Sequence, residues 1–149
     1  MTEITVTVLG TPAPQGSKDF FRGRPVESSK LVKPWRKAVA DAVLEHRANR
    51  HLQGPLAVDA VFYLARPKRH YGTGRNAAAL RGDAPDYPVA RGRGDTDKYA
   101  RGLLDALQLA GVYDDDGQVA DLTARKRYAE LGTLPGALVR VRPLGEDSH

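Results

Sequence analysis

A nine-residue segment at residues 56–64, LAVDAVFYL, constrains the fold of this chain more than any other feature. Apolar residues occupy both sets of alternating positions, with Leu56 and Val58 in one set and Val61 and Tyr63 in the other. Successive residues of a strand point to opposite faces of the sheet. We therefore expect a strand that is covered on both faces.

The periodicity of apolar residues predicts five further elements around this strand. In chain order, we expect a strand at 4–8, a helix at 34–48, the strand at 56–64, a helix at 97–110, and strands at 118–128 and 136–141. Residues 11–31 are rich in Pro, Gly and Ser and are expected to form a loop. We expect the last two strands to pair as an antiparallel hairpin. The order β-α-β-long loop-α-β-β predicts a single α/β (α+β) domain over 1–149, with a mixed sheet and two main helices.

The long loop at 66–94 has no apolar period and carries seven basic residues. Loops of this length inside a compact domain are uncommon and are usually functional or disordered. The basic content favours a flexible arm that meets phosphates, with Arg69, Arg91 and Arg93 as candidate DNA contacts. We expect His70 to be a solvated neighbour of those phosphates. A disordered insertion with no role is the alternative.

Charge and composition exclude several classes of protein. The chain has no cysteine, so disulfides and cysteine metal sites are excluded. No apolar run approaches the roughly 20 residues that cross a membrane, and the first residues do not resemble a signal peptide, so we expect a cytoplasmic protein.

The net charge is +5, yet residues 95–121 hold 7 acidic against 2 basic residues. A basic surface around an acidic island suits a polyanion and the cations that accompany it, although chance clustering also fits.

The acidic island places carboxylates at both ends of the second helix. Asp95 and Asp97 stand at its start, and residues 114–116, all aspartates, follow its end. A helix of about 14 residues is roughly 21 Å long, so the two groups meet only if the following strand runs back beside the helix start. Two or three gathered carboxylates would repel one another unless a cation such as Mg²⁺ lay between them, where it could activate water against a phosphodiester.

The same residues also fit ordinary structural roles. Asp95 or Thr96 suits a helix N-cap, Asp97 and Arg101 are spaced for a surface ion pair, and the DDDG run suits a turn. The run lacks the alternating spacing of a calcium loop, and no apolar strand precedes Asp95 as in phosphatases with an aspartate nucleophile. The four histidines form no metal-ligand or triad pattern.

Residues 95–126 resemble the RusA family of Holliday-junction resolvases. The family pattern is D-x-D-N-L-x-K-x-x-x-D-x-L, then Gly, then D-D-x-Q-V and a downstream Lys. This chain matches it in order and spacing at Asp95, Asp97, Leu103, Leu104, Asp105, Ala106, Leu107, Gly111, Asp115, Asp116, Gln118, Val119 and Lys126. The opening strand and the following Pro12, Pro14, Gln15, Gly16, Ser17 and Lys18 also resemble the family's first segment.

The resemblance implies a Mg²⁺-dependent endonuclease, with Mn²⁺ as the alternative ion, that resolves four-way DNA junctions by paired nicks. It implies that Asp95, Asp97 and Asp116 bind the metal, with Asp115 a weaker candidate, and that Arg101 contacts the scissile phosphate. Lys18, Lys98 and Lys126 are the candidate lysine contacts to DNA. It further implies a bacterial or phage origin, a homodimer and no small-molecule cofactor. We expect the dimer surface to be separate from the carboxylates and to involve strand 56–64 or the Trp35 side of the first helix.

Departures from the family pattern keep other functions open. Lys98 replaces the Asn, and Arg101 replaces the Lys. Arginine keeps a positive charge but is no general acid at ordinary pH. A junction-binding protein of the same fold that cleaves weakly or not at all is therefore the alternative. An unrelated metal-binding phosphatase or structural protein is a third reading, which the basic loop disfavours.

Overall fold

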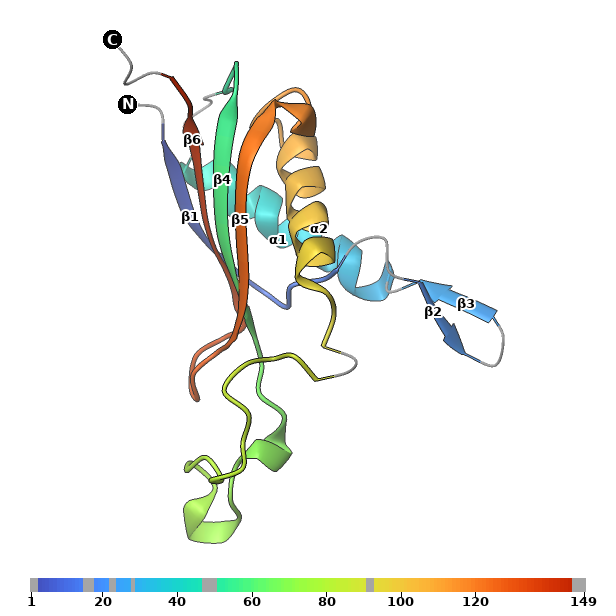
Figure 1. Cartoon of the computed structure of the whole chain (residues 1–149), viewed down its shortest axis with the longest axis vertical. Helices are drawn as coiled ribbons and strands as arrows, with labels where there is room; N and C mark the ends of the chain where they lie inside the picture. The colour runs from blue at the N-terminus through green and yellow to red at the C-terminus, as the bar shows by residue number, and fades with distance from the viewer. Residues whose placement is uncertain are drawn as a thin grey trace.

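Four strands form a mixed sheet, and two helices pack on one of its faces (Figure 1). This computed structural model describes residues 3–14, 18–21, 24–27, 29–46, 51–90 and 93–145, and for 18–29 only the backbone. The sheet consists of β1 (Ile4–Leu9), β4 (Leu56–Leu64), β5 (Val119–Tyr128) and β6 (Gly136–Pro143). The helices are α1 (Ser29–His46) and α2 (Thr96–Leu109). Neither helix is long and apolar enough to cross a membrane.

The strand order is β1-β6-β4-β5, so β4 lies inside the sheet and β5 at its edge. β4 pairs antiparallel with β6 and parallel with β5. The predicted hairpin between the last two strands is therefore wrong, because β4 separates them. The reason lies in their side chains: Val139 and Val141 of β6 are buried, whereas β5 carries exposed charges such as Asp121 and Arg125, which suit an edge strand.

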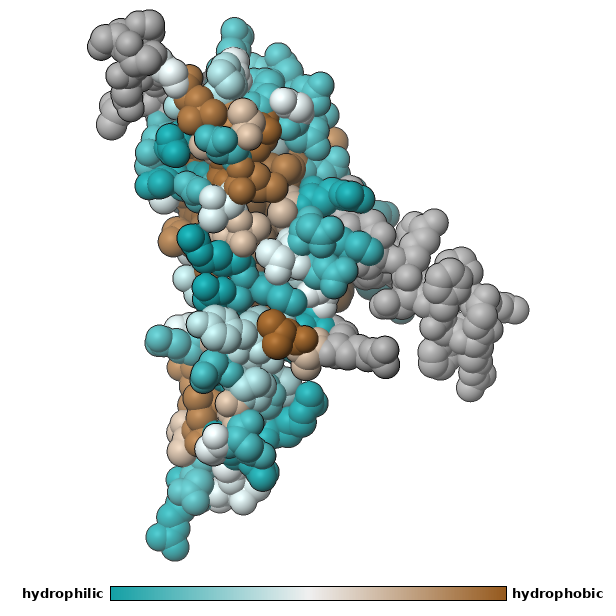
Figure 2. Space-filling model, viewed as in Figure 1, coloured by the Kyte–Doolittle hydropathy of each residue, from teal (hydrophilic) through white to brown (hydrophobic). Residues whose placement is uncertain are grey.

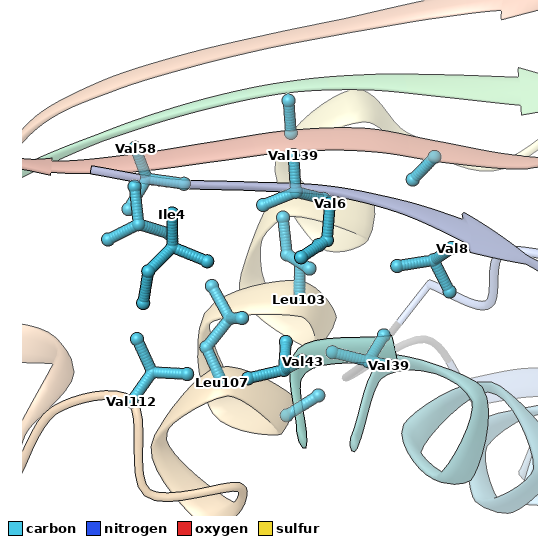
Figure 3. Packing of buried hydrophobic residues seen from close by; sticks show 14 of the residues in the cluster. Ile4, Val6, Val8, Val39, Val43, Val58, Leu103, Leu107, Val112 and Val139 are labelled. Carbon is cyan, nitrogen blue, oxygen red and sulfur yellow. The ribbon is translucent and has the colours of Figure 1, made fainter. Parts of the chain in front are cut away.

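The core fills the space between the sheet and the two helices (Figure 3). Val39 and Val43 of α1 and Leu103 and Leu107 of α2 point toward the inner face of the sheet, and all four are buried. Trp35 is 2% exposed and belongs to the same cluster, so it fills the core and offers no dimer surface.

The outer face of the sheet is not covered by either helix. β1 alternates strictly between buried and exposed residues, and on the outer face of β4 Val61 and Tyr63 are only half-buried. Strand 56–64 is thus fully packed on one face, whereas the sequence predicted cover on both. Gly136 of β6 is required by close packing, because a Cβ there would collide with the carbonyl oxygen of Val8.

Helix α2 occurs within one residue of its predicted bounds, whereas α1 begins five residues earlier than predicted. Pro34 therefore lies inside α1, where it removes one backbone hydrogen bond. The expected loop at 11–31 contains a two-stranded antiparallel hairpin of β2 (Lys18–Phe21) and β3 (Arg24–Glu27).

Residues 66–90, which we call the lobe, project from the end of the sheet at which α2 begins (Figure 1). The lobe contains the 3-10 turns η1 (Lys68–His70) and η2 (Gly74–Asn76). Its two limbs are joined by an antiparallel bridge between Tyr71 and Leu80 and by the hydrogen bond from the Arg81 N–H to the His70 carbonyl (2.8 Å). The predicted long loop thus has a defined internal structure.

Candidate active site

The start of α2 presents two exposed carboxylates. Asp95 occupies the N-cap position, but its side chain accepts no hydrogen bond from the helix, and Asp97 follows in the first turn. The predicted capping role of the Asp95 carboxylate and the predicted Asp97–Arg101 ion pair are both absent from the described residues. All three side chains are exposed, so each is available to a ligand.

Two hydrogen bonds fix the backbone just before these carboxylates. Lys126 Nζ, from β5, donates to the carbonyl of Gly94 (2.6 Å), and the Tyr99 hydroxyl donates to the carbonyl of Arg93 (2.6 Å). Gly94 has a φ of +89°, and a Cβ there would lie 2.8 Å from the Tyr99 hydroxyl oxygen. Lys126, predicted as a DNA contact, therefore also positions the start of α2. Burial raises the pKa of Tyr99, which keeps its hydroxyl protonated as a donor.

The second acidic group forms the turn between α2 and β5 and is ordered by amide side chains. Gln118 accepts hydrogen bonds from the backbone N–H groups of Asp114 (2.9 Å) and Asp115 (3.1 Å), and its amide donates to the carbonyls at Leu52 and Gly54. The Asp116 N–H donates to the side chain of Gln108 (2.8 Å). The Gln of the family motif is thus a positioning residue, a role that sequence reasoning missed.

The three aspartates of this turn differ in what their carboxylates contact. Asp114 lies 2.8 Å from His51 Nε2, and Asp115 caps η3 (Asp116–Gln118) by accepting from the Gly117 N–H (3.0 Å). Among the described residues, the carboxylate of Asp116 takes part in no hydrogen bond or ion pair. Asp116 is therefore the member of the triplet whose oxygens are free for a cation.

A buried tyrosine lies beneath the acidic turn. The Tyr113 hydroxyl donates to the carbonyl of Leu104 (2.7 Å), and burial, followed by the charges of Asp116, Asp105 and Asp115, raises its pKa. Asp105, another residue of the family motif, forms an ion pair with Arg36 of α1 at 2.7 Å. It joins the two helices and is not part of a metal site.

The two carboxylate groups lie at opposite ends of α2 within one chain (Figure 1). Helix α2 has 14 residues, which corresponds to roughly 21 Å. No cluster of three or more potential metal ligands occurs among the described residues. β5 does run back beside the start of α2, as the prediction required, but Asp116 precedes that strand and stays at the far end. Asp95 and Asp97 therefore do not meet Asp116 in the protomer.

Cations and a groove adjoin the Asp95 end. A groove of about 450 Å³ runs between the Pro12–Pro14 segment and the end of β4, with Arg66, Arg93 and Gly94 in its wall. Arg93 donates to the carbonyl of Ala65 (3.3 Å). Lys98 is half-buried in the first turn of α2, and Arg69 belongs to the lobe. Arg91 and the Lys18 side chain lie outside the described residues.

The sequence predicted a solvated His70, but in the structure this residue is buried, with only 7% of its surface exposed. Its ring stands edge-on to Tyr128, with ring centroids 5.4 Å apart, while the Arg66 guanidinium stacks on Tyr128 at 4.3 Å. Burial, and then the charges of Arg66, Arg69 and Arg93, lower the pKa of His70. Tyr128 of β5 supplies the hydrophobic support that the loop sequence alone did not reveal.

Comparisons with known proteins agree with this arrangement of motifs. Residues 10–142 match the model of the family described as endodeoxyribonuclease RusA. The chain is also 29% identical over 132 residues to the uncharacterized protein YqaN of Bacillus subtilis, an alignment that covers 85% of this chain and 89% of that protein. The family match therefore spans the groove, the lobe, both carboxylate groups and most of the sheet.

Proposed function

The chain belongs to the RusA endodeoxyribonuclease family, and on that basis we propose that it resolves four-way DNA junctions by metal-dependent phosphodiester hydrolysis. The family supports DNA endonuclease activity. The observation that carries the metal proposal is the pair of exposed carboxylates, Asp95 and Asp97, that have no partner among the described side chains and stand beside a groove walled by arginines. Free carboxylate oxygens beside cations suit a divalent ion bound together with a phosphate.

The donor set fits Mg²⁺. Hard oxygen ligands are what this ion prefers, and two or three aspartates suffice because it keeps several waters. When bound, the ion would polarise the phosphodiester and lower the pKa of an attacking water. Arg101 lies one turn after Asp97, and in this proposal its guanidinium contacts the scissile phosphate; being always charged, it supplies charge but no proton.

We further propose that two copies complete each site. The described sheet ends at β5, so one side of its backbone has no strand neighbour within these residues. Antiparallel pairing of β5 with β5 of a second copy, across a two-fold axis, sets the start of each strand beside the end of the other. Asp116 begins η3, the turn that leads into β5, and Lys126 near the end of β5 donates to the carbonyl of Gly94 beside Asp95. Each Asp116 thus approaches the Asp95 and Asp97 of the other copy.

The side chains of β5 favour one register for this pairing. When the axis passes through Thr123, Asp121 stands opposite Arg125 of the second copy, and the two copies make this pair twice. Opposite charges across a strand pair contribute about 0.2–1 kcal/mol each. Leu122 is 47% exposed, and hydrophobic residues gather on the surface over the upper part of β4 and β5 (Figure 2). In this proposed dimer the interface adjoins the carboxylates, whereas the sequence analysis expected the two to be separate.

The decisive experiment incubates the protein with a labelled four-way junction in Mg²⁺, in Mn²⁺ and in EDTA. We expect paired nicks with either ion and none in EDTA. Binding without cleavage in all three would favour the alternative, a junction-binding protein, which the departures at Lys98 and Arg101 suggest. Cleavage that persists in EDTA would refute the metal proposal.

A further inference from the structure

The lobe contains a pocket that the carboxylate site does not use. Its volume is about 400 Å³, and it is lined by Arg69, His70, Arg81, Asp83, Ala84, Pro85 and Ala90. The pocket lies between the two limbs of the lobe, because its lining comes from η1 on one side and from residues 81–90 on the other.

The pocket is built by contacts that hold its walls in place. Arg66 donates to the carbonyl of Pro85 (2.7 Å) across the limbs, and Arg127 of β5 stacks over Tyr87 at 5.0 Å. The Arg81 Nε donates to the Asp83 carboxylate at 3.3 Å. That bond orients the guanidinium while leaving its terminal nitrogens for another acceptor. The contacts of Arg66 and Arg127 thus hold the second limb of the lobe against the first limb and against β5.

His70 contributes a neutral donor to this pocket. Its Nδ1 lies 3.3 Å from Arg66 Nη1, and a guanidinium can only donate, so Nδ1 must accept. The ring hydrogen is therefore on Nε2, and within the described part of the chain no group accepts from that nitrogen. Arg69, Arg81 and His70 all line the pocket together with the single carboxylate of Asp83, so its donors outnumber its acceptors and suit a phosphate oxygen.

We propose that this pocket binds a single backbone phosphate of the DNA, on a stretch beyond the scissile phosphate. The proposal rests on the proposed function, since it takes branched DNA as the ligand. The lobe projects from the end of the sheet that carries Asp95 and Asp97 (Figure 1), so one DNA arm can meet both. The phosphate bound here is separate from the one that Arg101 meets, and it fixes the direction in which the arm leaves the active site.

Binding of a labelled four-way junction in EDTA, over a range of salt, tests this without any cleavage. The variants are Arg69→Gln and Arg81→Gln, alone and together. The matched control is Arg75→Gln, which removes the same charge from η2 in the same lobe but outside the pocket. We expect the double variant to lower the salt slope by about 1, the value for one phosphate contact, and the control to leave it nearly unchanged. Thermal unfolding verifies that each variant folds.

Phosphate-ethylation interference then tests for one phosphate. With the wild-type protein, ethylation of a specific arm phosphate should block binding, and the double variant should become insensitive to ethylation at that position. If Arg75→Gln lowered the salt slope as much as the double variant does, charge alone would explain the attraction of DNA, and the proposed phosphate site would be refuted. An unchanged salt slope in the double variant would refute it as well. Neither result touches the metal proposal, which Asp97→Asn tests through cleavage. A wild-type protein that binds no junction would overturn both.

Discussion

Asp97 stands exposed in the first turn of α2, and no described side chain pairs with it, so a substitution there removes no hydrogen bond or ion pair among the described residues. Asp97→Asn keeps the shape and removes the charge that holds a divalent ion. We expect the cleavage rate to fall on the order of 10²–10³-fold. Junction binding should persist or tighten, because one negative charge facing phosphates is gone. Single-turnover cleavage and binding assays measure the two effects.

The matched control for this variant is Asp41→Asn. Asp41 is also an exposed helical aspartate, and its loss removes only the surface pair with Lys37 (2.8 Å). It should cleave at the wild-type rate. Wild-type cleavage by Asp97→Asn itself would show that this carboxylate does not bind the metal.

Gly94 tests how strictly the start of α2 is positioned. Gly94→Ala places a Cβ 2.8 Å from the Tyr99 hydroxyl at a φ of +89°, so it adds a clash to backbone strain. Gly132→Ala, at +87° with nothing within 4 Å, adds strain alone. We expect a loss of about 1 kcal/mol in the free energy of unfolding for Gly132→Ala and about 2–3 kcal/mol for Gly94→Ala. Urea denaturation compares them; equal losses would mean that Tyr99 moves aside freely.

The residues proposed to carry the chemistry could be selected from the sequence, but their arrangement could not. Asp95 and Asp97 could be predicted because D-x-D precedes a clear apolar stripe, and Asp116 because it follows the helix end. Their separation also follows from the helix length. The proposed partner of Asp116 in a second copy could not be predicted, since strand pairing across two chains leaves no periodic signal. The roles of Gln118 and His70 depend on neighbours that are distant in sequence.

At the scale of elements, local patterns predicted the helices and strands but not the strand order. Strands 118–128 and 136–141 are consecutive and close in sequence, which is typical of a hairpin. β6 instead pairs with β1 and β4, because its buried valines complete the inner face of the sheet, whereas the charges of β5 tolerate an edge. The β2–β3 hairpin was missed because the Pro, Gly and Ser content of residues 11–31 also suits a loop.

The pairing register of β5 gives a test at this scale. In Asp121→Arg, an arginine would face Arg125 of the second copy twice, and like charges in opposed positions destabilise a strand pair. We expect this variant to shift toward monomer and to lose cleavage. The double variant Asp121→Arg with Arg125→Asp restores opposite charges, so it should restore the dimer. Analytical ultracentrifugation at micromolar protein measures both, and a monomeric wild type would contradict the pairing.

The attachment of the lobe to β5 should depend on pH through His70. Its pKa is lowered first by burial and then by Arg66, Arg69 and Arg93, with Asp83 opposing them. The pKa of His70 in the folded state lies below its ordinary value of 6.5, so folding favours the neutral ring. The contribution of the neutral His70 ring to stability is therefore fully present above about pH 6.5 and is lost as the pH falls through the folded-state pKa.

We expect amide hydrogens of the lobe to lose protection from exchange below about pH 6.5, once intrinsic rates are corrected for pH. In His70→Gln, which cannot charge, this loss should disappear. His46→Gln, which alters an exposed histidine of α1, should behave as the wild type. Protection that stays constant down to pH 5 in the wild type would show that the His70 contacts do not hold the lobe in place.

At the scale of the whole molecule, the two-copy site predicts that two inactive variants rescue each other. Asp97→Asn and Asp116→Asn should each be inactive as homodimers. A mixed dimer contains one site that joins the intact Asp95 and Asp97 of one chain to the intact Asp116 of the other, while its second site carries both substitutions. Because half of the dimers in an equal mixture are mixed and each has one intact site, about one quarter of the sites are restored.

The products of the mixture distinguish this arrangement further. A mixed dimer should nick one strand of the junction and leave its two-fold counterpart intact, so nicked junctions should accumulate where the wild type yields paired cuts. Co-refolding the two variants from urea and separating the strands on a denaturing gel measures this. If each site were formed within one chain, both sites of every dimer would carry a substitution. The mixture would then stay as inactive as its components, which would disprove the two-copy site while leaving the role of the carboxylates in cleavage intact.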